Sequence, residues 1–240
     1  MRTYLLIGMA CLGLLASNLS YALNLTAHSW LVADGNGKII NGEKVEDIRS
    51  IASISKLVTV MVVLDAHQDL DEYIKPYTRR ELIQLALVKS DNNAAKSLCE
   101  HYPGGYTACV YAMNTKMYRL GLNNTKFIEP TGLSVFNVST ATELVKLVQT
   151  ASTYPEIISA SQTSQVKIKI KKQWFVFNNT NPIIGKRHDF IVSKTGYIRA
   201  SGGCIVMMLD TNLGRRIVVV LGSKNTQTRI PEAEFIAKKS

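Results

Sequence analysis

The chain has 240 residues, a formal net charge of +10 at pH 7 and a hydrophobic content of 46%. This length and composition predict one large globular domain or two closely packed subdomains. The basic charge favours anionic polymers or carboxylate-bearing substrates, and nucleic acid is excluded as a partner because no binding motif supports it.

The first residues predict a secretory signal peptide, residues 1–22. Arg2 is a short positive region, Leu5–Leu15 is apolar, and small residues end at Ala22 before a cleavage point. An uncleaved membrane anchor is disfavoured because the apolar run is too short for a comfortable span. We therefore expect the mature protein, residues 23–240, to be periplasmic. Export to the periplasm is a second reason to exclude nucleic acid as a partner.

A strand hairpin is predicted for residues 29–41, around a Gly/Asn turn. The next segment predicts a core helix, because its apolar residues recur at helical spacing. Ser53 and Lys56 stand three positions apart at its start, so their side chains share one face and can touch. A hydroxyl beside an amine is one way to make an activated nucleophile. Most serine and lysine pairs at this spacing are nevertheless only a serine that caps a helix and a lysine on the surface.

Further helices are predicted in the middle of the chain. One begins at the capping box Thr78–Glu81, breaks at Ser90-Asp91-Asn92 and then resumes. Another spans about residues 106–120, and a last one begins at a second capping box, Thr140–Glu143.

After residue 160 the hydrophobic period changes to that of strands. Gln165–Phe177 alternates apolar and basic residues over its first half, which predicts a strand with one solvated face. We interpret the lysines of Lys167–Lys172 as that solvated face rather than as a binding surface. Three more strands are predicted at residues 190–198, 202–210 and 215–223.

This layout predicts an α+β protein. A central antiparallel sheet is assembled from both ends of the chain, and a helical subdomain, roughly residues 66–160, is inserted between them. The whole of residues 23–240 is expected to form one domain. The last residues, 228–240, are too short and mixed for an amphipathic membrane anchor, so no stable anchor is expected.

Three motifs occur in order along the chain. Ser53-Ile54-Ser55-Lys56 is followed by Ser90-Asp91-Asn92 at a break between helices, and then by Lys194-Thr195-Gly196 on a predicted strand. S-x-x-K, S-D-N and K-T-G together are the signature of class A β-lactamases and penicillin-binding proteins. A capping serine, a turn and an ordinary strand lysine do not explain the three together.

The chemistry explains why these residue types are needed. Ser53 is the expected nucleophile, and Lys56 can act as its general base only when neutral. That requires burial and a like charge, such as Lys194, to lower the pKa of Lys56. Ser90 is expected to relay a proton towards the leaving amine, and Asn92 to hold Lys56 and the substrate amide.

The third motif is expected to bind the substrate. Thr195 and Gly196 lie on a strand that can pair with an extended peptide, and Gly196 keeps a side chain away from that approach. The backbone N–H groups of Ser53 and Tyr197 are expected to form the oxyanion hole.

Beyond the motifs, the chain resembles the low-molecular-mass penicillin-binding proteins, serine D-Ala-D-Ala peptidases of the S11 type. The resemblance rests on SIASISKL, KSDNNAA, FIEPTGLSVFNVSTATEL, NTNPII, SKTGY and GGCIVMML, and is closest to the penicillin-binding protein 7/8 type of D-alanyl-D-alanine endopeptidase. It implies a β-lactamase/transpeptidase-like fold and an acyl-enzyme on Ser53. It also implies peptidoglycan peptides as substrate, β-lactams as covalent inhibitors, and wall-synthesis or lytic enzymes as candidate protein partners. Neither a metal nor a cofactor is expected.

Several alternatives stay open. Endopeptidases of this type cut the D-alanyl–meso-diaminopimelyl cross-link, whereas carboxypeptidases remove a terminal D-alanine. A β-lactamase would need a water-activating base, and Glu129, in the loop FIEPTGLS, is not marked as one. A non-catalytic wall-binding or β-lactam-sensing module is the remaining alternative.

The cysteines and arginines leave further questions. Cys99 and Cys109 flank the turn HYPGGY, where a disulfide and two free thiols are both compatible with the sequence. Cys204 is predicted to be a buried free thiol. Three arginines are candidates to hold a substrate carboxylate or to be solvated strand charges: Arg199, Arg215 and Arg216.

Overall fold

The computed structural model describes residues 25–186 and 189–239. The predicted signal peptide, residues 1–22, lies outside the described residues. Among the residues that are described, no helix is long and apolar enough to cross a membrane.

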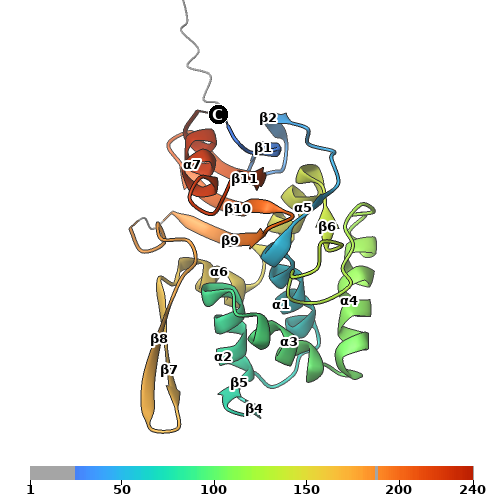
Figure 1. The fold of residues 1–240 in the computed structure, drawn as a ribbon, viewed down its shortest axis with the longest axis vertical. Helices are drawn as coiled ribbons and strands as arrows, with labels where there is room; N and C mark the ends of the chain where they lie inside the picture. Colours follow the sequence, from blue (N-terminus) through green and yellow to red (C-terminus); the bar gives the residue numbers. More distant parts are fainter. Residues whose placement is uncertain (1–24, 187–188, 240) are drawn as a thin grey trace, which may run out of the picture.

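A five-stranded antiparallel sheet forms the upper part of the molecule (Figure 1), with strand order β2-β1-β11-β10-β9. The chain therefore returns from its last third to pair β11 with β1, as expected for a sheet built from both chain ends. The strands of this sheet are β1 (Ser29–Asp34), β2 (Ile39–Glu43), β9 (Phe190–Ile198), β10 (Gly202–Thr211) and β11 (Gly214–Ser223).

Helices cover both faces of the sheet and fill the lower half of the molecule (Figure 1). The helical elements are η1 (Ala52–Ile54), α1 (Ser55–Asp65), α2 (Arg79–Gln84), the π-helix η2 (Leu85–Lys89), α3 (Asn92–Glu100), α4 (Gly105–Arg119), α5 (Ala141–Ala151), α6 (Pro155–Gln162) and α7 (Arg229–Lys239). Short strand pairs join β3 (Arg49–Ser50) to β6 (Val138–Ser139) and β4 (Tyr73–Ile74) to β5 (Tyr77–Thr78). The predicted α+β class is confirmed.

The central strands are apolar on both sides because each face meets a helical layer. In β10, Val206 and Met208 join the large core that contains α1 and α5, whereas Ile205 and Met207 join a second core under α7. We did not predict α7, because the composition of its segment is mixed. The helix packs on the sheet through four buried side chains: Ile230, Ala233, Ile236 and Ala237.

Both predicted capping boxes lie where helices begin, but only the first is complete, because the Glu143 carboxylate accepts from the Asn124 N–H and the Thr125 hydroxyl instead. Thr78 accepts a hydrogen bond from the Glu81 N–H while Glu81 accepts one from the Thr78 N–H, and Thr140 accepts one from the Glu143 N–H. α5 packs against β1, β10 and β11, and thus lies on the sheet although it belongs to the predicted insertion. The division into subdomains stays a prediction.

The segment Gln165–Phe177 differs from the single strand that we expected. It forms a separate hairpin of two strands, β7 (Gln165–Ile170) and β8 (Gln173–Asn178). Lys171, at the turn, has a φ of 56°, in the left-handed region that glycine or asparagine usually occupies. The absence of a turn-forming residue here concealed the reversal of the chain.

Cys99 in α3 and Cys109 in α4 are joined by a buried disulfide with a Cα–Cα distance of 5.3 Å. Cys204 is free and buried, as predicted.

Replacing Cys99 and Cys109 together by alanine is expected to lower the free energy of unfolding by about 3 kcal/mol, because the bridge closes a loop of about ten residues in the unfolded chain. Urea unfolding of the wild type and the double variant checks this. An unchanged midpoint at an unchanged slope would show that the bridge does not stabilise the fold.

Candidate active site

Ser53 lies in the tight turn that leads into α1. The turn is η1, and the preceding residue, Ala52, has a φ of 47°, a conformation that few residues other than glycine adopt. Ala52 and Ile54 are completely buried, whereas Ser53 is partly exposed. The fold thus presents one hydroxyl to solvent on a rigid, buried support.

Lys56 reaches that hydroxyl. Its Nζ lies 2.8 Å from Ser53 Oγ, 2.7 Å from Asn92 Oδ1 and 2.5 Å from the carbonyl oxygen of Thr131. Three acceptors match the three N–H bonds of an ammonium group. The contact predicted from the spacing of Ser53 and Lys56 is therefore present, and so is the contact with Asn92.

Burial lowers the pKa of Lys56 from 10.5 to about 8. The negative charges of Glu129 and Asp91 act in the opposite direction and raise it. We expected the charge of Lys194 to lower the pKa of Lys56, but the structure shows the reverse effect, of Lys56 on Lys194. Burial first, and then the positive charges of Lys56 and Arg229, lower the pKa of Lys194 well below its usual value.

Ser90 and Lys194 form the second half of the cluster. Ser90 follows the last residue of the π-helix η2, and its φ of 60° is again left-handed. A π-helix and a left-handed residue both occur often at functional sites. Lys194 Nζ donates to Ser90 Oγ at 2.8 Å and to the carbonyl of Thr195 at 2.9 Å. Two buried lysines thus each touch one serine hydroxyl.

The loop after Glu129 supplies an unexpected part of the site. The carboxylate of Glu129 accepts hydrogen bonds from the backbone N–H groups of Thr131, Gly132 and Ser134 and from the side-chain amide of Asn137. These bonds fold the loop so that the Thr131 carbonyl meets Lys56. Since donors occupy both carboxylate oxygens, Glu129 acts here as a structural acceptor.

Two glycines allow backbones to approach the Ser53 turn. A Cβ at Gly132, where φ is +81°, would lie 2.0 Å from the Ala52 carbonyl oxygen. A Cβ at Gly196 would lie 2.9 Å from the Ser53 nitrogen and equally close to the Ile51 carbonyl. Gly196 therefore makes room for the turn that carries Ser53, and the substrate clearance that we expected of it stays a prediction.

The end of the third motif has further partners. Thr195 Oγ1 donates to Thr180 Oγ1 at 2.7 Å, and the side chain of Tyr197 is half exposed. Arg229, which the sequence did not single out, is buried and donates to the Gly196 carbonyl at 2.7 Å. No local pattern marks Arg229, because it arrives from α7 across the sheet.

Of the three arginines that the sequence offered as carboxylate ligands, Arg215 and Arg216 lie apart from this cluster, and Arg199 stays a candidate. Arg215 pairs with Asp210 at 2.9 Å, and Arg216 follows it at the start of β11, in register with the Phe190 end of β9. Arg199 is exposed beyond the other end of β9.

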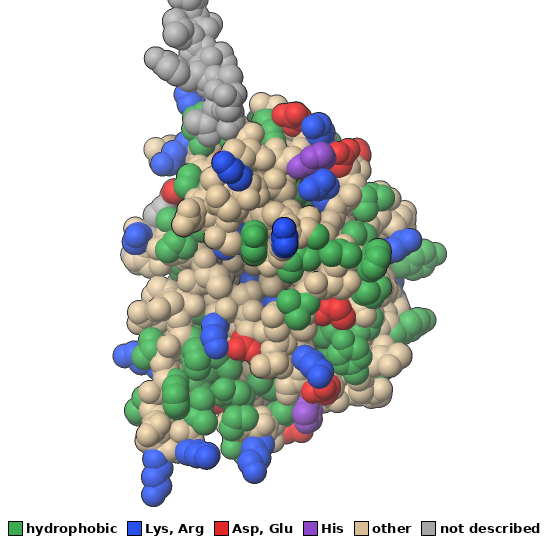
Figure 2. All heavy atoms as spheres, in the orientation of Figure 1, with side chains coloured by type: hydrophobic (Ala, Val, Ile, Leu, Met, Phe, Trp, Pro, Cys, Tyr) green, Lys and Arg blue, Asp and Glu red, His purple; other side chains and the backbone are tan. Residues whose placement is uncertain are grey.

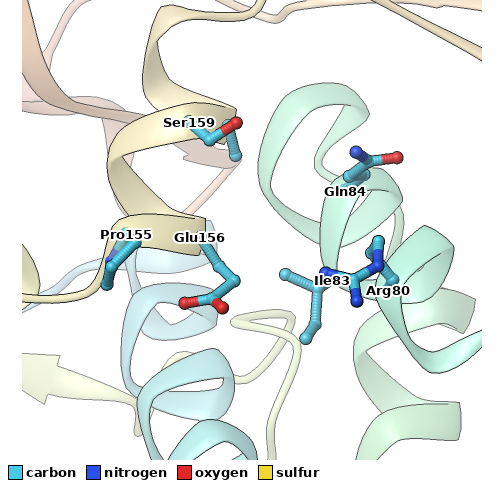
Figure 3. A pocket seen from close by; sticks show the side chains of 7 residues that line it. Arg80, Ile83, Gln84, Pro155, Glu156 and Ser159 are labelled. Carbon is cyan, nitrogen blue, oxygen red and sulfur yellow. The ribbon is translucent and has the colours of Figure 1, made fainter. Parts of the chain in front are cut away.

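A pocket of about 320 Å³ between α2 and α6 also lies away from the cluster (Figure 3). None of the motif residues lines it, and the Arg80 guanidinium at its edge is paired with Asp71. Within the described ranges, no group of three or more His, Cys, Asp and Glu side chains could hold a metal ion.

The fold and the cluster define a class of protein. The crystal structure of penicillin-binding protein D2 from Listeria monocytogenes with ampicillin bound superimposes with a TM-score of 0.80, at 25% identity over 90% of this chain and 97% of that one. The DD-transpeptidase of Streptomyces K15 matches with a TM-score of 0.81 at 22% identity, over 89% of this chain and 96% of that one. The predicted transpeptidase-like fold is confirmed.

Sequence comparison narrows the class to a family. The family model described as D-alanyl-D-alanine carboxypeptidase, peptidase family S11, matches residues 16–75 and 71–225. D-alanyl-D-alanine endopeptidases of Escherichia coli and Pseudomonas aeruginosa are 38% and 36% identical, over 87% of this chain and 75% of each relative. The chain belongs to peptidase family S11 and is a serine-type DD-peptidase, as the motifs predicted.

Proposed function

We propose that this protein is a periplasmic D-alanyl-D-alanine endopeptidase that hydrolyses peptide cross-links of peptidoglycan through an acyl-enzyme on Ser53. The observation that carries the proposal is the contact of two buried lysines, Lys56 and Lys194, with two serine hydroxyls. The choice of an endopeptidase is supported by the names of the two relatives above. The periplasmic location is supported by the predicted signal peptide.

In the acylation step, neutral Lys56 takes the proton of the Ser53 hydroxyl as Oγ attacks the D-alanyl carbonyl carbon. The backbone N–H groups of Ser53 and Tyr197 hold the oxyanion. When the tetrahedral intermediate collapses, the C–N bond breaks, and the proton that Lys56 took from Ser53 is relayed through Ser90 to the leaving amine. Water then attacks the ester, releases the acid and regenerates Ser53.

The surroundings suit an anionic peptide. The guanidinium of Arg229, which donates to the Gly196 carbonyl at 2.7 Å, supplies positive charge beside β9 and attracts a substrate carboxylate. In the described sheet β9 is also the last strand, so its outer edge near Thr195 can pair with an extended peptide. β-Lactams should acylate the same serine, in line with the ampicillin-bound relative.

Carboxypeptidase activity is the second candidate, because the matching family model carries that description and a D-alanyl-D-alanine carboxypeptidase of Bacillus subtilis is 24% identical over 83% of this chain. A β-lactamase is disfavoured, because the carboxylate of Glu129 is already engaged by backbone donors and is poorly suited to activate water.

The test incubates the mature protein and its Ser53→Ala variant with cross-linked muropeptide dimers and with monomeric pentapeptide, and identifies products by mass spectrometry. The proposal expects dimers to become monomers with the wild type only. Loss of one alanine from pentapeptide with intact dimers would make the enzyme a carboxypeptidase. Covalent trapping of penicillin without turnover of either substrate would favour a sensing role.

A further inference from the structure

The hairpin β7–β8 stands outside the main sheet and projects from the molecule beside the helices (Figure 1). Its base is fixed to the active site. The Thr180 N–H, just after β8, donates to the Val88 carbonyl at 3.0 Å, and the Thr180 hydroxyl accepts the hydrogen bond from Thr195. A long polymer that occupies the active site therefore has the hairpin as its neighbour.

The two faces of the hairpin differ. Val166 and Ile168 are buried, and Phe177, opposite Val166, lies beneath the ammonium group of Lys89 at 4.7 Å. This face packs towards η2. The register pairs Lys167 with Val176 and Lys169 with Trp174, so these four side chains share the other face, here called the outer hairpin face.

The outer hairpin face combines positive charge with exposed apolar area. Trp174 is 66% exposed and Val176 is 52% exposed, and the Lys169 ammonium lies 5.8 Å from the centre of the indole ring. Lys171 and Lys172 continue the charge into the turn, and residues 165–178 contain no Asp or Glu. Figure 2 shows hydrophobic side chains gathered at the lower left, where Figure 1 has the hairpin, with Lys and Arg around them.

Neither property is neutralised within the protein. In the part of the chain that the structure describes, none of the ion pairs involves the four lysines of the hairpin. The alternation predicted a strand face that is only solvated, and such a face favours a polar residue at position 174. The exposed indole of Trp174, among lysines without ion pairs, therefore indicates a binding surface.

We propose that the outer hairpin face binds the polymeric glycan–peptide substrate outside the catalytic cluster. This inference rests on the proposed function. Peptidoglycan is complementary to this surface, since its stem peptides carry carboxylates for the lysines and its sugar rings carry flat C–H faces for Trp174. The face holds the wall polymer while a cross-link enters the site near Ser53, and so raises the local substrate concentration.

An anionic phospholipid surface is the competing partner for a cluster of lysines and a tryptophan. Insertion would begin at the turn, where Lys171 and Lys172 stand without an apolar residue between them. Burying these two ammonium groups opposes insertion, so the sequence of the turn favours the polymer.

The test measures co-sedimentation with purified insoluble peptidoglycan, and in parallel with anionic phospholipid vesicles. All proteins carry Ser53→Ala, so that binding is measured without cleavage. Trp174→Ala, and separately Lys167→Gln with Lys169→Gln, are each expected to weaken binding to peptidoglycan about tenfold. The matched control is Tyr118→Ala on α4, an aromatic side chain that is 78% exposed on an element far from the hairpin in Figure 1.

Equal binding of the parent and both hairpin variants to peptidoglycan would overturn the inference, as would capture of the parent by vesicles rather than by the polymer. Cleavage by proteins that retain Ser53 is a second readout. The ratio of turnover on insoluble wall to turnover on soluble dimers should fall about tenfold in the hairpin variants. Failure of the wild type to cut dimers, with hairpin-dependent binding intact, would reject the proposed function alone.

Discussion

Lys56→Gln is expected to lower the rate of acylation by benzylpenicillin about 10⁴-fold, the upper end of what a general base contributes. Glutamine retains hydrogen-bonding groups near Ser53 and Asn92 but cannot accept the proton of the serine hydroxyl. The observation behind this expectation is the 2.8 Å contact of Lys56 Nζ with Ser53 Oγ. Covalent labelling followed by mass spectrometry measures the rate.

Lys116→Gln is the matched control. Lys116 is also a partly buried lysine with two hydrogen-bond partners, Asp65 and Tyr154, but it lies on α4 outside the catalytic cluster. Its replacement should cost stability and leave acylation at the wild-type rate. Comparable rates for Lys56→Gln and the wild type would remove Lys56 from the mechanism.

The dependence of acylation on pH follows from the same lysine. Burial depresses the pKa of Lys56 to about 8, so the neutral form that can act as a base predominates above that pH. The acylation rate of the wild type should therefore rise from about pH 6 and level off above about pH 9. In Lys56→Gln this rise should disappear. A rate that falls over this range would contradict a neutral lysine as the base.

The catalytic cluster could be predicted from the sequence because its parts are short local patterns. Ser53 and Lys56 contact each other through helical spacing alone, and Ser90 and Asn92 stand at a break between two recognisable helices. Lys194 lies on a strand with clear apolar flanks. The resemblance to a known family then supplied the order of the motifs and their meeting in space.

The remaining parts depend on contacts between distant segments. Arg229 contacts Gly196 from α7, a helix of mixed composition. Only its packing on the sheet shows that its few apolar residues form one buried face. The chain reverses between β7 and β8 at Lys171, which has a left-handed conformation. No glycine, asparagine or proline marks this turn in the sequence. The start of α6, by contrast, carries a local signal, because Pro155 stands at the first helical position.

The role of Glu129 could not be predicted either, because it also depends on contacts in the folded protein. The sequence placed Glu129 in the loop FIEPTGLS, a peptidase pattern, but did not indicate what its carboxylate binds. Its carboxylate holds three backbone N–H groups, and through them the carbonyl of Thr131 against Lys56. Its charge separately raises the pKa of Lys56. One side chain thus both positions a hydrogen-bond acceptor of Lys56 and raises the pKa of Lys56.

Glu129→Gln separates these two effects. The glutamine NH₂ would face backbone donors, so the loop should shift, and acylation by benzylpenicillin should slow about 100-fold at its maximum. Loss of the negative charge should also move the rise of the pH profile below about pH 8, because the carboxylate no longer raises the pKa of Lys56. Rates measured across the pH range report both changes.

Glu143→Gln provides the comparison for a purely structural carboxylate. Glu143 accepts hydrogen bonds from the Asn124 N–H and the Thr125 hydroxyl, and it lies on α5 away from Lys56. Its replacement should lower the thermal midpoint of unfolding and leave the pH profile in place. If Glu129→Gln behaved in the same way, with an unshifted profile, Glu129 would be a structural residue only, and the proton affinity of Lys56 would be set by burial and Asp91 alone.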